Sequence, residues 1–475
     1  MMRSMDSRTA TAHPVRRREY GGRLPDPSAF PLLTHRSPGD TVAWHQDRAY
    51  SKQEFLRSVQ ALALRLPAKR YAINLCRNRY HFAVGFAAAL LARQISLMPT
   101  CRAAEPLQQL SQRYPDAYLL TDHDEIESGL PRFLMTDVVE DDAGPAENPA
   151  IPADRIAAIV FTSGSSGIPR AHAKSWGSLV MGAQALGKQF DLSTSPSRIV
   201  VGTVPPQHMY GLETTIMAPL QWAWSIHAAN SVLPADIRTD LERLAAPAWL
   251  MTTPFHLKAY VSERVHLPGL EGIISATMPL SRSLAQEAER LWQSPVHEIY
   301  GCTEGGMLAS RRATSGDLWS LCPNLRMKQE GDVSWVTGGH VGTWLQLTDR
   351  IRIHDRREFI LLGPSYDLVK VAGKRASLAA LNAALNRVEG VSDGAFYWPD
   401  QGRSGQGRLC AFVVAPGVKP AAILADLRRR IDPVFLPRPI YLVSSLPRNA
   451  TGKLPHEQLE TFAGRIMHPN RPSRG

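Results

Sequence analysis

The sequence predicts an α/β protein with a large N-terminal domain built on parallel sheets and a small, mobile α+β C-terminal domain. Its 475 residues exceed what one ordinary hydrophobic core holds, so two or three domains are expected. Short apolar segments alternate with helical patterns through residue 300, which is typical of parallel, doubly wound sheets. Beyond residue 340, hairpin-like alternation and then a shorter mixed pattern indicate a small β-subdomain and a separate C-terminal unit.

The expected elements follow one another in a regular order. Residues 1–28 are polar and rich in Pro and Arg, and we expect them to be poorly ordered. Helical patterns occur at 51–66, 80–92, 104–113 and 282–292. Apolar strands are expected at 71–75, 95–98, 156–161, 199–204, 248–251, 272–275 and 296–300. Residues 343–362 predict antiparallel pairing, and a small α+β unit is expected from Asp367 onward.

Composition and charge restrict the class of protein and its partners. Five scattered cysteines without metal-ligand spacing fit a reducing cytosol and argue against a disulfide framework or a zinc site. The longest apolar run, 82–92, is shorter than the roughly 20 residues of a membrane helix, so we expect a buried helix in a cytoplasmic protein without a membrane span. The net charge of +11 fits either an acidic protein partner or simply a basic soluble enzyme. No nucleic-acid-binding module accompanies this charge, so nucleic acid is not expected as a partner.

A loop rich in Ser and Gly directly follows the strand expected at 156–161. Gly164 and Gly167 permit close backbone approach, and successive amides in such a loop can form an anion-binding nest. The loop also supplies hydroxyl donors and one cation, which suit a triphosphate: Thr162, Ser163, Ser165, Ser166 and Arg170. The Gly-Lys-Ser/Thr ending of a Walker loop is missing. On its own, the segment fits a phosphate site and a flexible surface loop equally well.

Further motifs follow this loop along the chain. They are His208-Met209-Tyr210-Gly211, Ser275-Ala276-Thr277-Met278-Pro279-Leu280, Tyr300-Gly301-Cys302-Thr303-Glu304, Leu347-Thr348-Asp349, Asp367-Leu368-Val369-Lys370-Val371-Ala372-Gly373-Lys374-Arg375 and Leu446-Pro447-Arg448-Asn449-Ala450-Thr451-Gly452-Lys453-Leu454. Together with the loop, they resemble the ordered motifs of the acyl-adenylating superfamily over residues 30–465. That superfamily comprises acyl-CoA synthetases, aryl-acid ligases, peptide-synthetase adenylation domains and luciferases.

The resemblance implies a site that activates a carboxylic acid with ATP and Mg²⁺. The loop would hold the β- and γ-phosphates, Tyr300 would pack on adenine, and Asp349 would accept both ribose hydroxyls. Thr303 would donate to the α-phosphate, and Glu304 would hold Mg²⁺, a cation that prefers oxygen ligands. Lys453 would bridge the substrate carboxylate and the α-phosphate. The resemblance adds further nucleotide-binding positions at Gly164, Gly167, Thr277, Met278 and Gly301.

The resemblance also places the pocket for the acid. Its implied positions are His208, Tyr210, Gly211, Gly305, Gly306 and Met307. Members that activate amino acids carry an aspartate near the His208 motif, but residues 207–211 contain none, and Glu213 does not overturn the preference for a plain carboxylic acid. The mixture of aromatic and small side chains favours a flat, hydroxybenzoate-like aryl acid, or a modest acyl chain.

In this family the C-terminal domain rotates between two half-reactions. The resemblance implies an AMP-binding domain at 29–363, a hinge at 364–367 and a lid domain at 368–475. Rotation would withdraw the catalytic lysine and present a second face for thiol attack on the acyl-adenylate. The implied hinge and thioesterification residues are Tyr366, Asp367, Lys370, Gly373 and Lys374.

The sequence departs from the family pattern at particular positions. Arg170 replaces the usual lysine of the loop, which keeps the charge and changes its geometry. Pro364 stands where most members carry an arginine that is directed at the nucleotide, and Arg350 is a candidate to compensate. Pro364 is also the only support for another class of function, a degenerate member that binds nucleotide without catalysis.

The thiol acceptor is predicted from chain length and charge. The chain is short for a CoA synthetase of this superfamily. Together with the run from Lys370 to Arg375, this resembles stand-alone ligases of aryl-polyene pigment and related secondary metabolism, which load an acyl carrier protein. Carrier proteins are acidic, so the net charge and Arg428-Arg429-Arg430 fit such docking, although the arginine run also fits a solvated helix face. The competing prediction is an acyl- or aryl-CoA ligase that uses free CoA.

Overall fold

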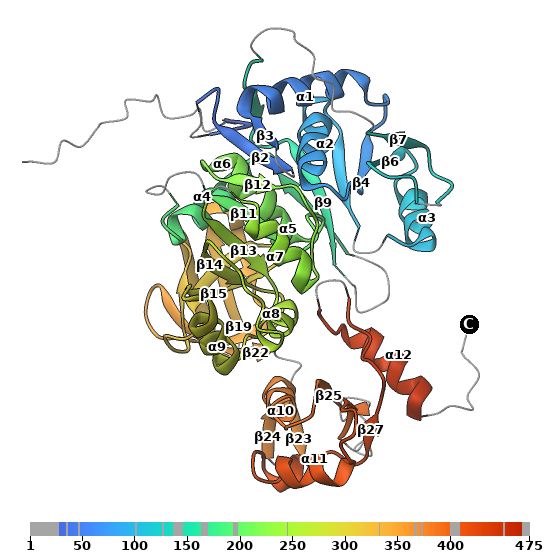
Figure 1. Ribbon diagram of the computed structural model, residues 1–475, viewed down its shortest axis with the longest axis vertical. Helices are drawn as coiled ribbons and strands as arrows, with labels where there is room; N and C mark the ends of the chain where they lie inside the picture. Colours follow the sequence, from blue (N-terminus) through green and yellow to red (C-terminus); the bar gives the residue numbers. More distant parts are fainter. Residues whose placement is uncertain are drawn as a thin grey trace, which may run out of the picture.

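The computed structural model describes most of the chain and shows a large N-terminal body and a smaller C-terminal one (Figure 1). The described residues are 28–34, 37–45, 48–99, 102–125, 128–135, 146–162, 170–192, 198–244, 246–331, 333–364, 368–371, 374–399, 409–449 and 452–467. The expected disorder of the N-terminal segment concerns residues that lie almost entirely outside these ranges. The Ser/Gly loop between residues 163 and 169 also lies outside them.

The first sheet of the N-terminal body has the strand order β10-β9-β5-β4-β6-β7. Its pairs are parallel except for β10 with β9, which confirms the expected parallel arrangement. Its strands are β4 (Tyr71–Asn74), β5 (Ile95–Met98), β6 (Ala117–Thr121), β7 (Arg132–Leu134), β9 (Ile156–Thr162) and β10 (Arg170–Ser175). The accompanying helices are α1 (Lys52–Arg65), α2 (Arg79–Leu91) and α3 (Ala104–Arg113).

Two helices of this region show why the sequence folds locally as it does. A capping box starts α1, because the Ser51 side chain accepts from the backbone N–H of Glu54 while Glu54 accepts from that of Ser51. Helix α2 contains the apolar run noted in the sequence, and it is buried along almost its whole length, as expected.

The second sheet has the order β21-β22-β17-β16-β15-β14-β13-β11-β12-β2-β3. Its central pairs, from β15 to β2, are parallel, and its outer pairs are antiparallel. The strands are β2 (Thr41–His45), β3 (Arg48–Ser51), β11 (Ile199–Gly202), β12 (Ser225–His227), β13 (Ala248–Thr252), β14 (Leu270–Ser275), β15 (Val296–Cys302), β16 (Gly306–Arg312), β17 (Leu318–Leu321), β21 (Asp349–Ile353) and β22 (Glu358–Pro364).

Helices and short antiparallel elements complete this body. The helical elements are α4 (Trp176–Gln189), α5 (Met209–Gly211), the π-helix η1 (Leu212–Met217), α6 (Ala218–Gln221), α7 (Pro234–Glu242), α8 (Pro254–Ser262), α9 (Arg282–Trp292) and the 3-10 turn η2 (Gly339–Val341). The sheet β18-β19-β20 (Leu325–Glu330, Val333–Gly338, Gly342–Gln346) is small and antiparallel, and β1 (Ala29–Pro31) pairs with β8 (Ala150–Pro152). The antiparallel pairing expected at 343–362 occurs in β20 and in β21 with β22, and the latter pair extends the edge of the second sheet.

The C-terminal body has its own hydrophobic cores and mixed structure. It contains the hairpin β23 (Leu368–Val371) and β24 (Lys374–Ser377), and a sheet of β25 (Asp393–Tyr397), β26 (Cys410–Val414) and β27 (Ile440–Leu442). Its helices are α10 (Leu378–Leu385), α11 (Pro420–Leu427), the 3-10 turn η5 (Pro433–Phe435) and α12 (His456–Met467). The predicted α/β class with a small α+β C-terminal unit is therefore confirmed. Among the described residues, no helix is both long enough and apolar enough to cross a bilayer.

Candidate active site

The first feature of the site is a contact between two of the predicted motifs. The hydroxyl of Tyr300, on β15, donates a hydrogen bond to Oδ2 of Asp349, the first residue of β21, over 2.9 Å. The Tyr300 ring is held edge-on by Trp319 and Phe359, each with its ring centre 5.9 Å away. Burial raises the pKa of both Tyr300 and Asp349. The fold thus joins the predicted adenine and ribose positions in one polar pair.

The segment that follows β14 is held in an unusual conformation beside this pair. Thr277 has a φ of +80°, which a β-branched residue rarely adopts and which tends to occur at ligand sites. Three residues on, the Leu280 backbone N–H donates to Oε1 of the buried Glu298 over 2.9 Å. Glu298 is in turn held by Arg311, whose Nε and Nη2 lie 2.9 and 2.7 Å from its Oε2. This chain of contacts anchors the segment predicted to lie along the adenine.

The turn at Glu304 is supported from strand β10. Nε2 of His172 lies 3.5 Å from Oε1 of Glu304 and 3.1 Å from Oγ1 of Thr162. Nζ of Lys174 donates to the backbone oxygen of Glu304 over 2.5 Å. Because side chains alternate along a strand, His172 and Lys174 share one face of β10 and both meet this turn.

The carboxylate of Glu304 is partly exposed, which leaves it available to a cation. Across the described ranges, no cluster of three His, Cys, Asp or Glu side chains forms a metal cage. A single carboxylate fits Mg²⁺, which usually keeps several waters and takes its other ligands from substrate phosphates.

Local contacts hold the His208 motif in place. The ring Nδ1 of His208 accepts from the Tyr210 backbone N–H over 3.3 Å and caps α5. The Tyr210 hydroxyl donates to the backbone oxygen of Ile274 over 2.7 Å. Gly211 lies so close to the carbonyl of Pro205 that any side chain there would collide with it. Burial, followed by the positive charge of Lys453, lowers the pKa of His208 to about 4, so its ring is neutral at physiological pH.

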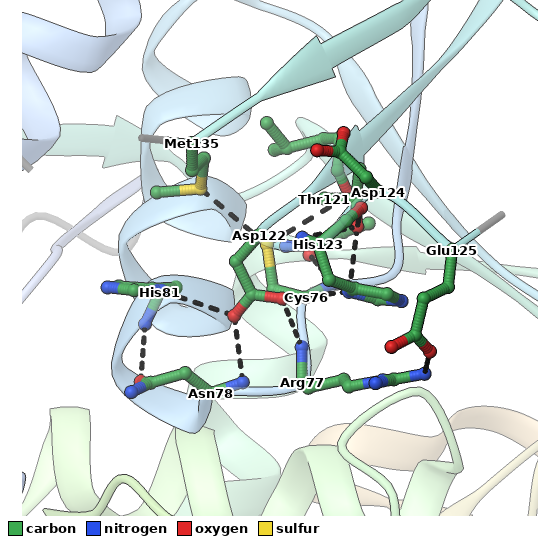
Figure 2. Close-up of polar contacts among 12 residues, drawn as sticks. Cys76, Arg77, Asn78, His81, Thr121, Asp122, His123, Asp124, Glu125 and Met135 are labelled. Carbon is green, nitrogen blue, oxygen red and sulfur yellow. Dashed lines mark hydrogen bonds and ion pairs between the residues drawn. The ribbon is translucent and has the colours of Figure 1, made fainter. Parts of the chain in front are cut away.

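A polar network at the end of β6 fixes the turn between β4 and α2 (Figure 2). Asp122, directly after β6, accepts the backbone N–H groups of Arg77 and Asn78 over 2.8 and 2.9 Å. The rings of His81 and His123 each place Nδ1 3.1 Å from its carboxylate. These hydrogen bonds hold the Asp122 pKa well below its usual range. The network therefore keeps the start of α2 in place.

The start of α2 in turn supports the segment that leads to His208. Nη2 of the buried Arg79 donates to the backbone oxygen of Val204 over 2.8 Å. Gln207 donates to the backbone oxygen of Asn74 over 3.0 Å and accepts from Arg102 over 3.2 Å. The position of His208 is thus tied to the first sheet as well as to the second.

The C-terminal body brings the predicted catalytic lysine to the same place. Gly452, at a φ of +76°, is so close to α8 that a Cβ there would lie 2.6 Å from Cβ of Phe255 and 3.5 Å from Sδ of Met278. The adjacent Lys453 is exposed, and its charge acts on both His208 and Asp349. A second contact joins the two bodies, since Nζ of Lys258 on α8 donates to the backbone oxygen of Ser392 over 2.8 Å.

Some predicted positions are placed by the structure and others are not. Gly305, Gly306 and Met307 lie at the turn into β16, and Thr303 precedes them. Asp349 is directly opposite Pro364 in the pairing of β21 with β22, and Arg350 is opposite Gly363. Outside the described residues or side chains lie Ser163, Gly164, Ser165, Ser166, Gly167, Tyr366, Asp367, Lys370, Gly373 and Lys374.

Sequence reasoning gave no structural role to a group of polar residues near the predicted site. Lys174, Glu213 and His340 are buried and His172 is half-buried, and of these only Glu213 was considered, as a partner for a substrate ammonium group. The signal for His172 and Lys174 was present, because a short segment after the loop alternates polar and small residues as an edge strand does. The other two give no such signal, since neither is part of a regular polar alternation.

Comparisons with known proteins agree with this geometry. The sequence profile of the AMP-binding enzyme family matches residues 35–363, and that of the AMP-binding enzyme C-terminal domain matches residues 380–453. The chain therefore belongs to the AMP-binding enzyme family, and it is an AMP-forming acid–thiol ligase.

Individual relatives share only a low sequence identity with this chain. A 4-coumarate–CoA ligase from Rhodobacter capsulatus is 27% identical over 301 residues, which cover 62% of this chain and 74% of the relative. The ATP-bound MatB from Rhodopseudomonas palustris has a TM-score of 0.76 at 18% identity, with 91% of this chain and 97% of that chain covered. O-succinylbenzoate Coenzyme A Synthetase (MenE) from Bacillus subtilis, in complex with ATP and magnesium ion, has a TM-score of 0.75 at 17% identity, with 91% and 100% covered. At these identities, the two structures are similar in fold alone.

Proposed function

We propose that this enzyme adenylates an aromatic, hydroxybenzoate-like carboxylic acid and transfers the acyl group to the phosphopantetheine thiol of an acyl carrier protein. In the first step, a carboxylate oxygen attacks the α-phosphate of ATP, the bond to the β-phosphate breaks, and pyrophosphate leaves. In the second, the thiol attacks the acyl-adenylate and AMP leaves. The protein would be cytoplasmic, where both ATP and carrier protein are available.

The observation that carries the adenylation step is the position of the Lys453 loop. The loop packs against Phe255 and Met278, and the charge of Lys453 reaches both His208 on the acid side and Asp349 on the nucleotide side. A cation between two approaching anions offsets their repulsion, and its effect increases as water is excluded. Mg²⁺ would supply further positive charge at the phosphates, with Glu304 as its protein ligand.

The choice of an aromatic acid rests on the pocket and on one relative. The predicted pocket combines the aromatic side chains of His208 and Tyr210 with Gly211, Gly305 and Gly306, and this composition favours a flat ring. The R. capsulatus relative is named for an aromatic acid, 4-coumarate. Its name also specifies CoA, and this favours the competing function, an aryl-CoA ligase, as the second candidate.

The choice of a carrier protein rests on charge. The chain has a net charge of +11, and Arg428, Arg429 and Arg430 are exposed at the end of α11. The charge of this run is reduced within the molecule, since Arg429 and Arg430 each pair with Asp426 over 2.5 Å. The long-range positive field, more than this arginine run, is what would attract an acidic carrier protein.

Pyrophosphate exchange tests the first step. Acid-dependent ATP–pyrophosphate exchange across a panel of benzoates, cinnamates and fatty acids should be strongest with a hydroxybenzoate. Lys453→Ala should reduce it by at least about 100-fold, whereas Lys419→Ala, an exposed lysine of the same body, should not change it. Exchange that persists in Lys453→Ala would reject the role of this lysine, and the absence of exchange with any acid would favour the non-catalytic nucleotide-binding alternative.

Thioester formation tests the acceptor. The purified enzyme, supplied with ATP and the preferred acid, should load a holo-acyl carrier protein faster than it forms an acyl-CoA at equal thiol concentration. Equal or faster formation of acyl-CoA would overturn the carrier-protein proposal and leave the adenylation step intact.

A further inference from the structure

The wall of the predicted acid pocket contains a buried carboxyl group. Glu213, on η1, is 5% exposed, and its Oε1 accepts the Met307 backbone N–H over 3.2 Å. Among the described residues, no hydrogen bond reaches its Oε2 and no ion pair includes it. A buried carboxyl group with an unused oxygen costs free energy unless something fulfils its hydrogen-bonding capacity.

Glycines on two facing elements make room for this carboxyl group. A Cβ at Gly306, at the start of β16, would collide with Glu213 Oε1, and one at Gly182 on α4 would lie 3.3 Å from it. Gly306 itself has a φ of +71°, which suits glycine. Gly306 and Met307 are predicted pocket positions, and their contacts with Glu213 would place its carboxyl group in the wall of that predicted pocket.

A buried cation, Lys174, lies on the same side of the site. Its residue is 6% exposed, and its Nζ donates to the backbone oxygen of Glu304 over 2.5 Å. Its charge acts on Glu213 without a direct ion pair between them. Burial raises the pKa of Glu213 to about 7, although the Met307 N–H and Lys174 act in the opposite direction. The wall therefore offers a hydrogen-bonding carboxyl group and a cation, each with capacity left over.

A purely structural role for Glu213 would need only one of its two carboxyl oxygens. Glu213 binds the N–H of Met307, and Nε2 of His340 lies 2.7 Å from the Met307 carbonyl, so these two side chains hold both backbone groups of one pocket residue. A glutamine could serve as this clamp through its amide oxygen, without the cost of burying an ionisable group. Holding Met307 therefore does not by itself require a carboxyl group at this position.

We propose that Glu213, together with Lys174, determines specificity by binding a hydroxyl group on the ring of the acid substrate. This inference rests on the proposed function and specifies its substrate class. A phenolic hydroxyl can donate to Glu213 Oε2 and accept from Lys174 Nζ. An aliphatic chain would leave Glu213 Oε2 and the remaining donors of Lys174 Nζ without partners. An ammonium group would be repelled by Lys174.

Substrate variation in the unmodified enzyme provides the first test. Exchange rates would be compared for benzoate and its hydroxy, methoxy and fluoro derivatives, each substituent at the meta and para positions. A site built around a hydroxyl donor should favour the best hydroxybenzoate over the matching methoxy and unsubstituted acids by at least about tenfold in kcat/KM. Equal kcat/KM for the hydroxy and methoxy acids would overturn the inference.

A matched pair of variants provides the second test. Glu213→Gln keeps an oxygen for the Met307 N–H, and it should reduce the ratio of kcat/KM between the hydroxy and unsubstituted acids by at least about tenfold. Glu287→Gln, an exposed position on α9, should leave this ratio unchanged. An equal loss for both acids in Glu213→Gln would assign Glu213 to the Met307 clamp alone. Failure of the proposed function has a different signature, since then no acid supports exchange even in the unmodified enzyme.

Discussion

Arg448 holds Asp393 through a two-pronged ion pair, with Nε and Nη2 each 2.7 Å from a carboxylate oxygen. The third nitrogen, Nη1, donates to the backbone oxygen of Gly452 over 3.0 Å. One guanidinium therefore ties the loop that carries Lys453 to the start of β25. Ser392, which directly precedes Asp393, accepts a hydrogen bond at its backbone oxygen from Lys258 of the N-terminal body. The residue that anchors the Lys453 loop, Asp393, and the residue that contacts the N-terminal body, Ser392, are therefore neighbours in the chain.

The first prediction concerns this ion pair. The Arg448 and Asp393 side chains are 15% and 22% exposed, so water only weakly screens the attraction between them, and the ion pair is bidentate. Arg448→Lys keeps the charge but loses the planar fork, and adenylation should fall by about tenfold. Arg429→Lys changes an exposed pair of the same body and should alter exchange less than about twofold. Equal effects in the two variants would contradict the anchoring role.

The second prediction concerns Tyr300 and Asp349. Asp349→Asn should raise KM for ATP by at least about tenfold, because the amide offers one acceptor where a ribose diol would use two. Tyr300→Phe removes only the 2.9 Å hydrogen bond and keeps the ring between Trp319 and Phe359, so its KM for ATP should rise about two- to fivefold. Exchange at varied ATP, with the acid saturating, measures both. An unchanged KM for ATP in Asp349→Asn would remove this residue from the nucleotide site.

The third prediction is a pH dependence of stability. The pKa of His208 is about 4 in the folded protein and 6.5 as the ordinary value. Between these pH values the unfolded chain binds a proton that the folded protein excludes. Above pH 6.5 the His208 ring is neutral in both states and does not lower the free energy of unfolding. As pH falls from 6.5 toward 4, the free energy of unfolding decreases progressively, by up to about 3 kcal/mol.

Urea unfolding at pH 7 and pH 4.5 measures this effect. His227 also has its pKa lowered to about 4, so the unmodified protein loses stability through more than one group. Comparison of the unmodified protein with His208→Gln isolates the contribution of His208. Between pH 7 and pH 4.5, the free energy of unfolding of the variant should fall by about 2 kcal/mol less than that of the unmodified protein. The same loss in both proteins would mean that His208 is readily protonated in the folded state.

The sequence predicted those parts of the fold whose signal is local. The run at 95–98 is β5 itself, because a strand buried on both faces reads as a continuous apolar segment. The resemblance assigned Tyr300 to the adenine and Asp349 to the ribose, and the fold joins these two side chains by a hydrogen bond that the motifs did not predict. The 199–204 strand ends early, at Gly202, since the chain then turns toward Pro205.

Other features depend on contacts that no local pattern encodes. Strand β10 escaped prediction because it is short and polar, yet it positions Lys174. Glu213 is the one acidic residue of the short π-helix η1, and its burial depends on glycines of two other elements. The Arg448–Asp393 pair joins a loop to a strand 55 residues away. In each case the deciding partner comes from a distant segment.

The last prediction concerns the packing of α4, the helix that carries Gly182 beside Glu213. Gly187, further along α4, lies against the indole of Trp222, and a methyl group there would collide with the ring. The indole cannot easily move, since its Nε1 donates to the Ala183 carbonyl over 2.9 Å. Gly187→Ala should therefore displace α4 and lower the free energy of unfolding by about 2–3 kcal/mol.

Gly464→Ala is the matched control for this change. Gly464 lies in α12 with open space where the Cβ would be, so alanine should stabilise its helix by about 0.5–1 kcal/mol. Displacement of α4 should also raise KM for the acid, because Gly182 borders the Glu213 side of the pocket. Urea unfolding and exchange kinetics on both variants measure these effects. If Gly187→Ala were as stable as the unmodified protein, the Trp222 contact would not define the position of α4.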